Sequence, residues 1–276
     1  MDTNRRHFFK TMGVAVASAS LVGAARSGNA KPASLPFTLG MASYSFRKFD
    51  LQQCLDMTQR LGLQKIAFKS FHLPLDASND KIRETVSKVQ QAGLELYGGG
   101  VIYMKNEEQV HQAFDYAKAA GMRVIIGVPN HELLQLVDAK VKEYDIVVAI
   151  HNHGPGDDLY PSPESVYEKV DMLDSRIGLC IDIGHTKRIG LDPSAEYEKY
   201  HDRVFDIHVK DVSAATAEGQ TVEIGRGVID IPKFLKTLAS HNYQGAVSLE
   251  FEKDADDPLP GAAESIGYLR GVMAMM

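Results

Sequence analysis

Three similar junctions between a helical pattern and an apolar run constrain the fold of this chain most strongly. In each, a glycine ends the helical pattern, an apolar residue follows and a β-rich run begins; the stretches are Arg60–Ile66, Gln91–Leu96 and Ala119–Val124. A glycine in the left-handed conformation is a common C-terminal cap of a helix. Gly62, Gly93 and Gly121 stand 31 and 28 residues apart. This is the spacing of a repeated βα unit.

The same alternation continues along the chain and predicts eight strands. These are about 39–46, 65–71, 95–101, 124–129, 146–151, 177–182, 204–209 and 246–250. Helical patterns lie between them, for example at 107–120 and at 163–173, where Ser162 is the expected N-cap and Pro163 takes the first helical position. Eight βα units in about 250 residues predict a single-domain α/β fold, the (β/α)8 TIM barrel, with its active site at the C-terminal ends of the strands. An open doubly wound sheet is the alternative, but no Gly-x-Gly-x-x-Gly follows the first strand to support it.

The N-terminus reads as an export signal. Asn4–Lys10 contains paired arginines, a small and apolar run extends from Met12 to about Ala25, and Gly28-Asn29-Ala30 offers a cleavage site. The apolar run is shorter than the roughly 20 residues that a membrane-spanning helix needs. We therefore expect residues 1–30 to be a cleavable twin-arginine signal peptide and 31–276 to be the barrel. The mature protein would be periplasmic or otherwise exported, without stable insertion in a membrane.

Charge and cysteine content limit the partners. The signal segment holds four of the 30 basic and one of the 36 acidic residues, so its removal changes the formal charge from −6 to −9. An acidic protein is a poor binder of phosphate backbones, and we expect no nucleic-acid partner. Cys54 and Cys180 fall in a predicted helix and a predicted strand, which suits buried thiols better than a disulfide framework. Homo-oligomer formation stays open.

Polar residues end four of the predicted strands. They are His151-Asn152-His153, Asp182-Ile183-Gly184-His185, His208-Val209-Lys210-Asp211 and Glu250 within Ser248–Glu252. An unpaired buried polar group costs several kcal/mol. Because side chains alternate across a strand, parity places all four polar sets on the face opposite the large apolar residues. We expect that face to point into the mouth of the barrel.

Imidazole and carboxylate groups gathered in this way suit a divalent metal ion. The predicted ligands are His151, Asp182, His208 and Glu250, with His153 as an alternative fourth ligand or a base. The candidate ions are Mn²⁺, Zn²⁺, Co²⁺ and Mg²⁺, and a mixed nitrogen and oxygen set leans toward a transition metal. A purely structural polar network is the alternative.

Three further residues share the predicted mouth or lie close to it. Lys210 is either a catalytic or substrate-binding ammonium or an ion-pair partner of Asp206 or Asp211. Lys69 and His72, near the end of the second strand, either bind substrate hydroxyls or belong to a solvated loop.

With these motifs in place, the chain resembles the xylose isomerase-like TIM-barrel superfamily from about Phe37 onward. That superfamily includes sugar phosphate isomerases and epimerases, ketose 3-epimerases, inosose dehydratases and the endonuclease IV branch. The matching stretches are Asp182-x-x-His185, His208-x-Lys-Asp211, Ile224-Gly225-Arg226-Gly227-x-x-Asp230 and Ser248-Leu-Glu250. The resemblance implies that Asp182, His208 and Glu250 bind a metal and that His185 touches substrate.

The fifth strand departs from the family pattern. Family members often carry Glu-Asn-His there, whereas this chain has His151 in the place of the glutamate. In the epimerases that glutamate and the last-strand glutamate exchange protons on opposite faces of the substrate, so a symmetrical two-glutamate mechanism is in doubt. The endonuclease IV branch has Asp-x-His after the seventh strand, and here the sequence is Asp230-Ile231-Pro232.

The resulting expectation is a metal-dependent sugar isomerase or epimerase. It would act by α-proton abstraction and an enediolate intermediate on a free sugar or keto-sugar. Glu250 or His153 would be the base, Lys210 and His185 would steady the oxyanion or hydroxyls, and Arg226 would hold a distal group. A lyase or dehydratase of 3-keto-glycosides is the alternative within enzymes. A non-catalytic carbohydrate-binding protein is the alternative of another class.

Overall fold

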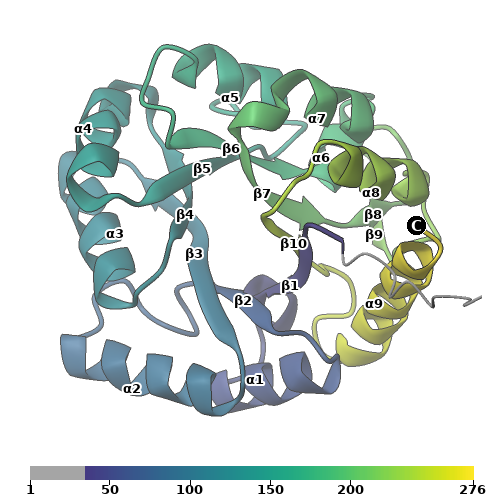
Figure 1. Cartoon of the computed structure of the whole chain (residues 1–276), viewed down its shortest axis with the longest axis horizontal. Coiled ribbons are helices and arrows are strands. Elements are labelled where there is room, and N and C mark those ends of the chain that lie inside the picture. The colour runs from purple at the N-terminus through teal and green to yellow at the C-terminus, as the bar shows by residue number, and fades with distance from the viewer. Residues whose placement is uncertain (1–34) are drawn as a thin grey trace, which may run out of the picture. The chain divides into compact units, whose positions relative to one another are not determined.

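Eight parallel strands close into a barrel in the computed structural model, which describes residues 35–276 (Figure 1). Around the barrel they run in the order β1-β10-β7-β6-β5-β4-β3-β2. Their bounds are β1 Thr38–Ala42, β2 Lys65–Phe68, β3 Glu95–Met104, β4 Val124–Pro129, β5 Val147–His151, β6 Ile177–Asp182, β7 Val204–Val209 and β10 Ala246–Leu249. The predicted (β/α)8 barrel is confirmed, and the alternative prediction of an open doubly wound sheet is wrong. The predicted signal peptide lies outside the described residues.

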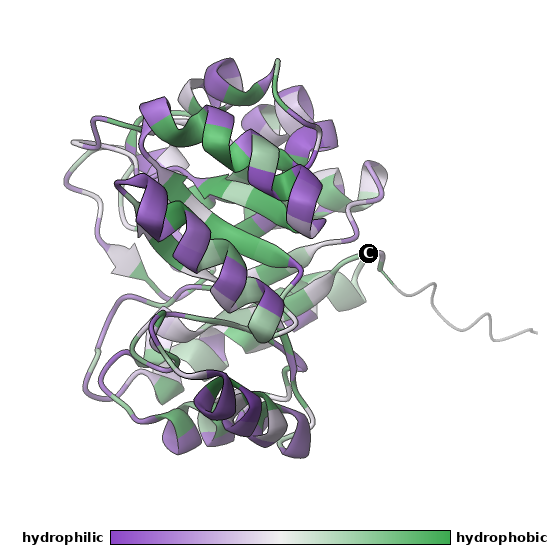
Figure 2. Cartoon of the chain, turned by 90° about the vertical axis from the view of Figure 1, so that its left-hand side faces the viewer, coloured by the Kyte–Doolittle hydropathy of each residue, from purple (hydrophilic) through white to green (hydrophobic). Residues whose placement is uncertain are grey.

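Helices surround the strands and cover their outer face (Figure 1). They are α1 Leu51–Arg60, α2 Asn79–Gln91, α3 Glu107–Ala119, α4 Leu134–Tyr144, α5 Pro163–Val170, α6 Ile183–Arg188, α7 Pro193–Tyr200, α8 Ile231–Ser240 and α9 Leu259–Ala274. Short 3-10 helices are η1 Ser43–Phe46, η2 His131–Leu133 and η3 His201–Arg203, and β8 Asp211–Val212 pairs with β9 Thr221–Val222. Figure 2 shows hydrophilic residues on the outer helix faces and hydrophobic strands behind them.

The three predicted glycine junctions are confirmed. Gly62, Gly93 and Gly121 have φ values of 65°, 67° and 67° directly after α1, α2 and α3. This left-handed conformation lets each helix end and the chain turn into the next strand without strain. Ser162 caps α5 by accepting a hydrogen bond from the backbone N–H of Ser165, and Pro163 is the first helical residue.

The predicted alternation of side chains between the two faces of the strands is also confirmed. It separates an outer core, between strands and helices, from an inner core within the barrel. Large aliphatic residues on the outer face, such as Val148 and Ile207, pack with the helices. The inner face is filled largely by smaller side chains; the buried cluster there is Ala67, Tyr97, Ile126, Ala149, Cys180 and Ala246. The packed interior leaves room for polar groups at the mouth.

Three strand ends differ from the prediction by three or more residues, and one of them is β2, which ends at Phe68 instead of Phe71. β1 ends at Ala42 instead of Phe46 because the chain turns at once into η1. β3 continues to Met104 instead of ending at Val101, and its register against β4 shifts between Gly100 and Ile102. Such a shift re-aims the side chains that follow it.

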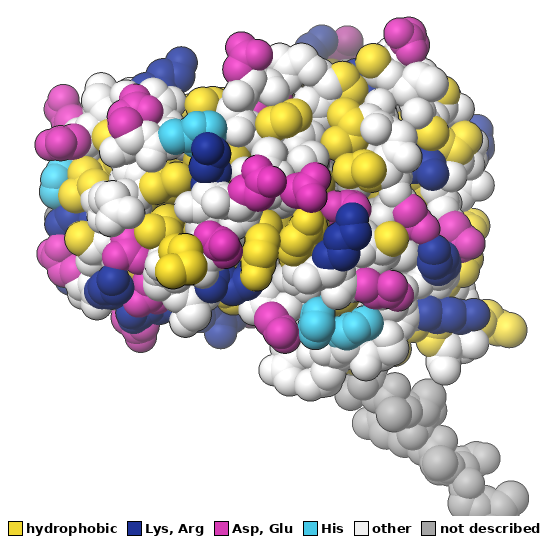
Figure 3. Space-filling model, turned by 90° about the horizontal axis from the view of Figure 1, so that it is seen from above, with side chains coloured by type: hydrophobic (Ala, Val, Ile, Leu, Met, Phe, Trp, Pro, Cys, Tyr) yellow, Lys and Arg dark blue, Asp and Glu magenta, His cyan; other side chains and the backbone are white. Residues whose placement is uncertain are grey.

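The outer surface shows two further features. Acidic and basic side chains are interspersed on the face seen in Figure 3. Between residues 35 and 276, every helix is too short or too polar to cross a membrane.

Candidate active site and metal centre

A cavity of about 240 Å³ opens at the C-terminal ends of the barrel strands. Its lining comes from β1, β2, β3, β5, β6 and β10 or the residues that directly follow them, namely Tyr44, Lys69, Val101, Tyr103, His151, His153, His185, Glu250 and Glu252. The cavity therefore lies where the active site of a TIM barrel is expected.

Neighbouring strand registers bring the four predicted ligands together. His151 of β5 pairs with Cys180 of β6, and Asp182 pairs with His208 of β7. His208 pairs with Ser248 of β10, two residues before Glu250. One ligand atom from each of the four residues lies within 4.8 Å of those of the other three.

The donor atoms converge on one point. His151 Nε2 lies 3.1 Å from His208 Nδ1 and 3.4 Å from Asp182 Oδ2, and His208 Nδ1 lies 3.3 Å from Glu250 Oε2. All four side chains are buried. Their oxygen and nitrogen atoms face each other instead of solvent.

The two imidazoles titrate in opposite directions. Burial lowers the pKa of His151 to about 3, although its contact with Asp182 opposes the shift. Burial would also lower the pKa of His208, but the carboxylates of Glu250 and Asp206 raise it above its ordinary value. His151 is therefore neutral at neutral pH, while His208 holds a proton more tightly than a free histidine does.

One carboxylate oxygen of Asp182 accepts a backbone hydrogen bond, and the other faces the four-residue cluster. Its Oδ1 accepts a hydrogen bond of 2.7 Å from the backbone N–H of His185 and so caps α6, and its own backbone N–H donates to Asn152 Oδ1. Burial would raise the pKa of Asp182, but His185 and Lys210 hold it well below its usual range. Oδ2 thus faces the cluster as a carboxylate oxygen.

Lys210 places an ammonium group against three carboxylates. Its Nζ lies 2.9 Å from Asp182 Oδ2, 2.8 Å from Glu250 Oε2 and 2.9 Å from Glu252 Oε1. Burial opposes its charge, but Asp182 and Glu250 raise the pKa of Lys210 well above its ordinary value. Burial would raise the pKa of Glu250, yet Lys210 and His208 lower it well below the usual range.

Within the described chain, the prediction that Lys210 pairs with Asp206 or Asp211 is wrong. Asp206 lies one layer deeper in the barrel and accepts a hydrogen bond from Tyr97. Asp211 has the opposite parity, and its carboxylate accepts backbone N–H groups of the 223–229 segment, including those of Gly225 and Gly227. That segment therefore closes on Asp211 and leaves Lys210 to the cavity.

His153 and His185 complete the histidine-rich wall. The His153 ring lies 4.5 Å from the His151 ring and 5.9 Å from the His185 ring, between centroids. His153 Nε2 is 3.1 Å from Tyr103 Oη, and its Nδ1 is 3.7 Å from Asp157 Oδ2. Burial lowers the pKa of both His153 and His185, so both are neutral at neutral pH.

One of the three predicted substrate-binding residues lines the cavity, and two lie outside it. Lys69 lines the cavity, with Nζ 2.5 Å from Val101 O and 5.5 Å from the Tyr103 ring centroid. The structure does not bring His72 to the cavity, because its buried ring packs on Phe71 and its Nε2 lies 3.1 Å from Phe49 O. It does not bring Arg226 there either, since the exposed guanidinium pairs with Glu264 of α9.

Sequence reasoning missed Tyr44, Tyr103 and a role for Glu252. Tyr44 belongs to η1, which was predicted as strand, and Tyr103 follows the register shift in β3. Parity did place Glu252 on the correct face. Its contact with Lys210 is the signal that the sequence alone could not provide.

The donor set fits a divalent cation. Asp182 Oδ2 is buried without a well-formed hydrogen bond, its contacts being the ion pairs with His151 and Lys210. His151 Nε2 and His208 Nδ1 face each other at 3.1 Å, so at least one of them presents a bare lone pair. Two imidazole nitrogens and two carboxylates are the ligand types of Zn²⁺, Mn²⁺ and Co²⁺ sites.

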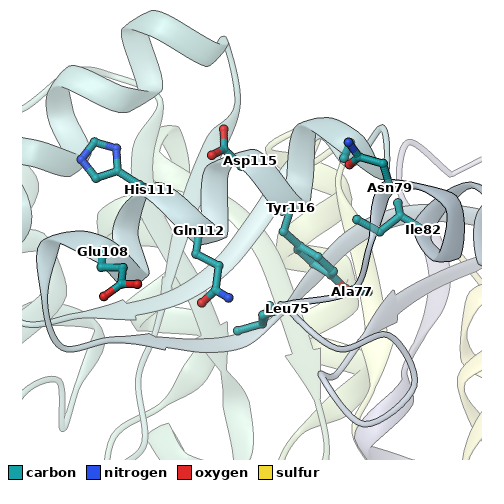
Figure 4. A pocket seen from close by; sticks show the side chains of 10 residues that line it. Leu75, Ala77, Asn79, Ile82, Glu108, His111, Gln112, Asp115 and Tyr116 are labelled. Atoms are coloured by element: carbon teal, nitrogen blue, oxygen red, sulfur yellow. The ribbon is translucent and has the colours of Figure 1, made fainter.

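A second hollow, of about 380 Å³, lies outside the barrel (Figure 4). It is lined by the segment leading into α2 and by the exposed side of α3, including Glu108, His111 and Asp115. It shares no lining residue with the cavity at the strand ends and contains none of the predicted site residues.

Metal affinity is expected to fall as the pH falls, because one proton, that of His208, competes with the metal ion. A metal ligand must be deprotonated, and the raised pKa of His208 means that affinity is full above that pKa and is lost as the pH falls through it. His151 adds no second proton until about pH 3. Titration calorimetry with Zn²⁺ between pH 8 and pH 5.5 should show a loss of about tenfold per pH unit below the His208 pKa. An affinity independent of pH would contradict the assignment of His208.

Comparison with known proteins gives the same picture of the fold. The model of the xylose isomerase-like TIM barrel family matches residues 43–272. The rhizopine catabolism protein MocC of Rhizobium meliloti is 26% identical over 144 residues, 47% of this chain and 44% of that protein. An inosose dehydratase of Clostridium beijerinckii is 28% identical over 124 residues, 39% of this chain and 41% of that enzyme. The chain thus spans less than half the length of these curated relatives.

A solved structure extends the similarity over nearly the whole described chain. A D-tagatose 3-epimerase-like protein superposes with a TM-score of 0.71 at 18% identity, covering 87% of this chain and 98% of that one. At this identity the likeness concerns the fold.

Proposed function

The chain belongs to the xylose isomerase-like TIM barrel family, and on this premise we propose that it is a divalent-metal-dependent sugar isomerase or epimerase. It would remove a proton from the carbon beside a substrate carbonyl and pass through an enediolate. The observation that carries the proposal is the convergence of His151, Asp182, His208 and Glu250 at the floor of a cavity that also holds other proton-transfer groups. A divalent cation held by these four residues would supply positive charge beside the carbonyl and neighbouring hydroxyl oxygens, which acidifies the C–H between them.

Two groups that line the cavity are suited to move the proton. Glu250 is held as a carboxylate by Lys210 and His208 and can accept a proton from substrate. His153 is neutral, and its Nδ1 makes no hydrogen bond within the described chain. A neutral imidazole in this position can accept or return a proton.

The remaining polar residues are suited to orient substrate and hold developing charge. Lys210 presents its ammonium beside Glu250, and His185 lines the same cavity. Both can donate to an oxyanion or hydroxyl, which stabilises negative charge in a water-poor site. Lys69 lines the same cavity and can do so as well, and burial lowers its pKa.

A lyase or dehydratase of 3-keto-glycosides is the second candidate, favoured by one observation. The fifth-strand position that carries glutamate in many family members holds His151, so the proton-transfer groups that line the cavity are the Glu250 carboxylate and the His153 imidazole. Such an unlike pair suits proton removal on one side and protonation of a leaving hydroxyl on the other. Relatives named as inosose dehydratases support the same chemistry.

Deuterium exchange tests the proposal directly. Metal-loaded protein is incubated in D₂O with aldoses, ketoses and keto-glycosides, and the substrate is followed by NMR, with chelator-treated protein as the control. We expect metal-dependent exchange of the proton beside the carbonyl. A rearranged or epimerised sugar would identify the first candidate, and loss of a β-substituent would identify the second. Binding without exchange, with or without metal, would favour a carbohydrate-binding protein instead.

We further propose that residues 1–30 export the folded protein through the twin-arginine pathway. The paired Arg5 and Arg6 and the short apolar run support this. Export argues for a free sugar, keto-sugar or keto-glycoside over a phosphorylated sugar. Wild-type protein should be periplasmic and begin near residue 31, whereas a variant with both arginines changed to lysine should stay in the cytoplasm at full length.

A further inference from the structure

We infer that Asp206 is a positioning residue that fixes the orientation and the tautomer of His208. The inference rests on the metal site of the proposed function, and nothing in the reaction itself requires a carboxylate at this depth. Asp206 lies two residues before His208 on the inner face of β7 and is completely buried. It has no access to the cavity, so any effect on chemistry must pass through a neighbour.

His208 is placed between Asp206 and the cavity. Its Nε2 lies 3.5 Å from Asp206 Oδ2, while its Nδ1 faces His151 Nε2 at 3.1 Å and Glu250 Oε2 at 3.3 Å. The other partners of the ring are therefore all on the Nδ1 side. Within the described chain, His208 Nε2 makes no well-formed hydrogen bond, and Asp206 Oδ2, at 3.5 Å, is the acceptor placed beside it.

Side chains of two further strands hold the Asp206 carboxylate, and a third strand holds one of those side chains. Tyr97 of β3 donates its hydroxyl hydrogen to Oδ1 at 3.0 Å, and the same hydroxyl lies 2.7 Å from Ser248 Oγ of β10. Cys180 of β6 donates its thiol hydrogen to Oδ2 at 3.5 Å. The carboxylate is thus anchored across the barrel interior, which stops it from rotating away from His208.

This arrangement determines which nitrogen of His208 carries hydrogen. A carboxylate lies near each ring nitrogen, Asp206 near Nε2 and Glu250 near Nδ1. Glu250 Oε2 already accepts a hydrogen bond of 2.8 Å from Lys210. Asp206 is therefore the carboxylate left to accept from His208, so that Nε2 carries the N–H and the Nδ1 of the neutral ring keeps its lone pair. A histidine that binds a metal with one nitrogen commonly donates its other N–H to a carboxylate, which orients the ring and increases its basicity. Asp206 therefore prepares His208 Nδ1 for the cluster before any cation arrives.

A different reading would make Cys180 a ligand. Donor atoms of His151, Cys180 and His208 also lie within 4.8 Å of each other. The thiol hydrogen, however, points at Asp206, and Asp182 and Glu250 supply two carboxylates on the cavity side. The two readings predict different results for a Cys180 variant.

Asp206→Asn tests the inference because it keeps the shape of the side chain and replaces one acceptor oxygen by an NH₂ donor. The tautomer of His208 is read in metal-free protein from the ¹⁵N NMR shifts of its ring, at a pH where the imidazole is neutral. We expect Nε2–H in the wild type and a shift toward Nδ1–H in the variant. Zn²⁺ affinity of the variant should fall by about 10- to 100-fold.

Two matched variants separate positioning from general damage to the interior. Tyr97→Phe removes the hydrogen bond to the other carboxylate oxygen and should leave the His208 tautomer unchanged, with a much smaller loss of Zn²⁺ affinity. Cys180→Ser should bind Zn²⁺ as the wild type does. A loss in Cys180→Ser equal to that of Asp206→Asn would overturn the inference in favour of a thiolate ligand.

The wild-type protein alone also decides the question if Asp206→Asn does not fold. A neutral His208 with Nδ1–H in the metal-free wild type would overturn the inference, and so would a folded Asp206→Asn protein with unchanged tautomer and Zn²⁺ affinity. Failure of the wild type to bind metal would instead overturn the proposed function. The tautomer measurement needs no metal and so distinguishes the two failures.

Discussion

Glu250→Gln is expected to lower kcat by about 10²- to 10⁴-fold, the usual contribution of a positioned acid or base, and to weaken metal binding. Gln keeps the size of the side chain but removes the negative charge that faces His208 Nδ1 at 3.3 Å and Lys210 Nζ at 2.8 Å. The variant should fold, because an amide oxygen can still accept from Lys210. Steady-state kinetics on the exchanging substrate and calorimetric metal titration measure the two effects separately.

Glu223→Gln is the matched control for that variant. Glu223 is also a largely buried glutamate paired with a lysine, with Oε1 2.8 Å from Lys253 Nζ, but it does not line the cavity. Its substitution should leave kcat and metal affinity unchanged. Normal turnover in Glu250→Gln would refute the assignment of Glu250 as ligand and base, and equal losses in both variants would point to a general electrostatic effect.

The fold could be predicted because its local signals agree with its global pattern. The glycine caps after α1, α2 and α3 and the apolar runs between them each specify one step of the same βα repeat. The errors lie where tertiary contacts override the local pattern. η1 was predicted as strand because Ser43–Phe46 continues an alternating run, but Ser45 Oγ donates to Leu249 O and accepts from the N–H of Phe251, which ties the turn to the end of β10.

The centre of the candidate site could be predicted from strand parity, whereas its rim could not. His151, Asp182, His208 and Glu250 belong to regular strands or to the residue after one, so alternation alone places them. Tyr103 follows a register shift in β3, which alternation cannot anticipate. His72 and Arg226 lie on loops, whose side chains turn toward local partners, Phe49 and Glu264, instead of the cavity.

The charge arrangement around Lys210 decides how strongly the metal-free site is held together. Asp182, Glu250 and Glu252 bring three carboxylates to one ammonium, and Asp182 is completely buried. Lys210 is the cation that compensates the two cluster carboxylates when no other cation is bound. Gly184 packs directly against the aliphatic part of the Lys210 side chain, because a Cβ added at Gly184 would lie 2.3 Å from Lys210 Cγ. This close packing prevents the Lys210 side chain from moving toward Gly184.

Lys210→Met is therefore expected to destabilise the metal-free protein by about 3–5 kcal/mol, the usual cost of breaking a buried ion pair by removing one partner. Met fills a similar volume, so the loss is of charge and hydrogen bonds. Metal should stabilise the variant more than it stabilises the wild type, because a divalent cation restores charge compensation and no longer competes with the ammonium for Asp182 Oδ2 and Glu250 Oε2. Urea denaturation with and without Zn²⁺ measures both quantities.

Lys140→Met provides the comparison at a site without buried carboxylates. The Lys140 side chain is only 13% exposed, but its partner Glu143 is 58% exposed, so water can solvate the carboxylate that is left behind. We expect this variant to lose less than about 1 kcal/mol and to respond to Zn²⁺ as the wild type does. If Lys210→Met were as stable as Lys140→Met without metal, Asp182 and Glu250 would not depend on the ammonium. If its response to Zn²⁺ were smaller than that of the wild type, Lys210 would assist cation binding instead of competing with it.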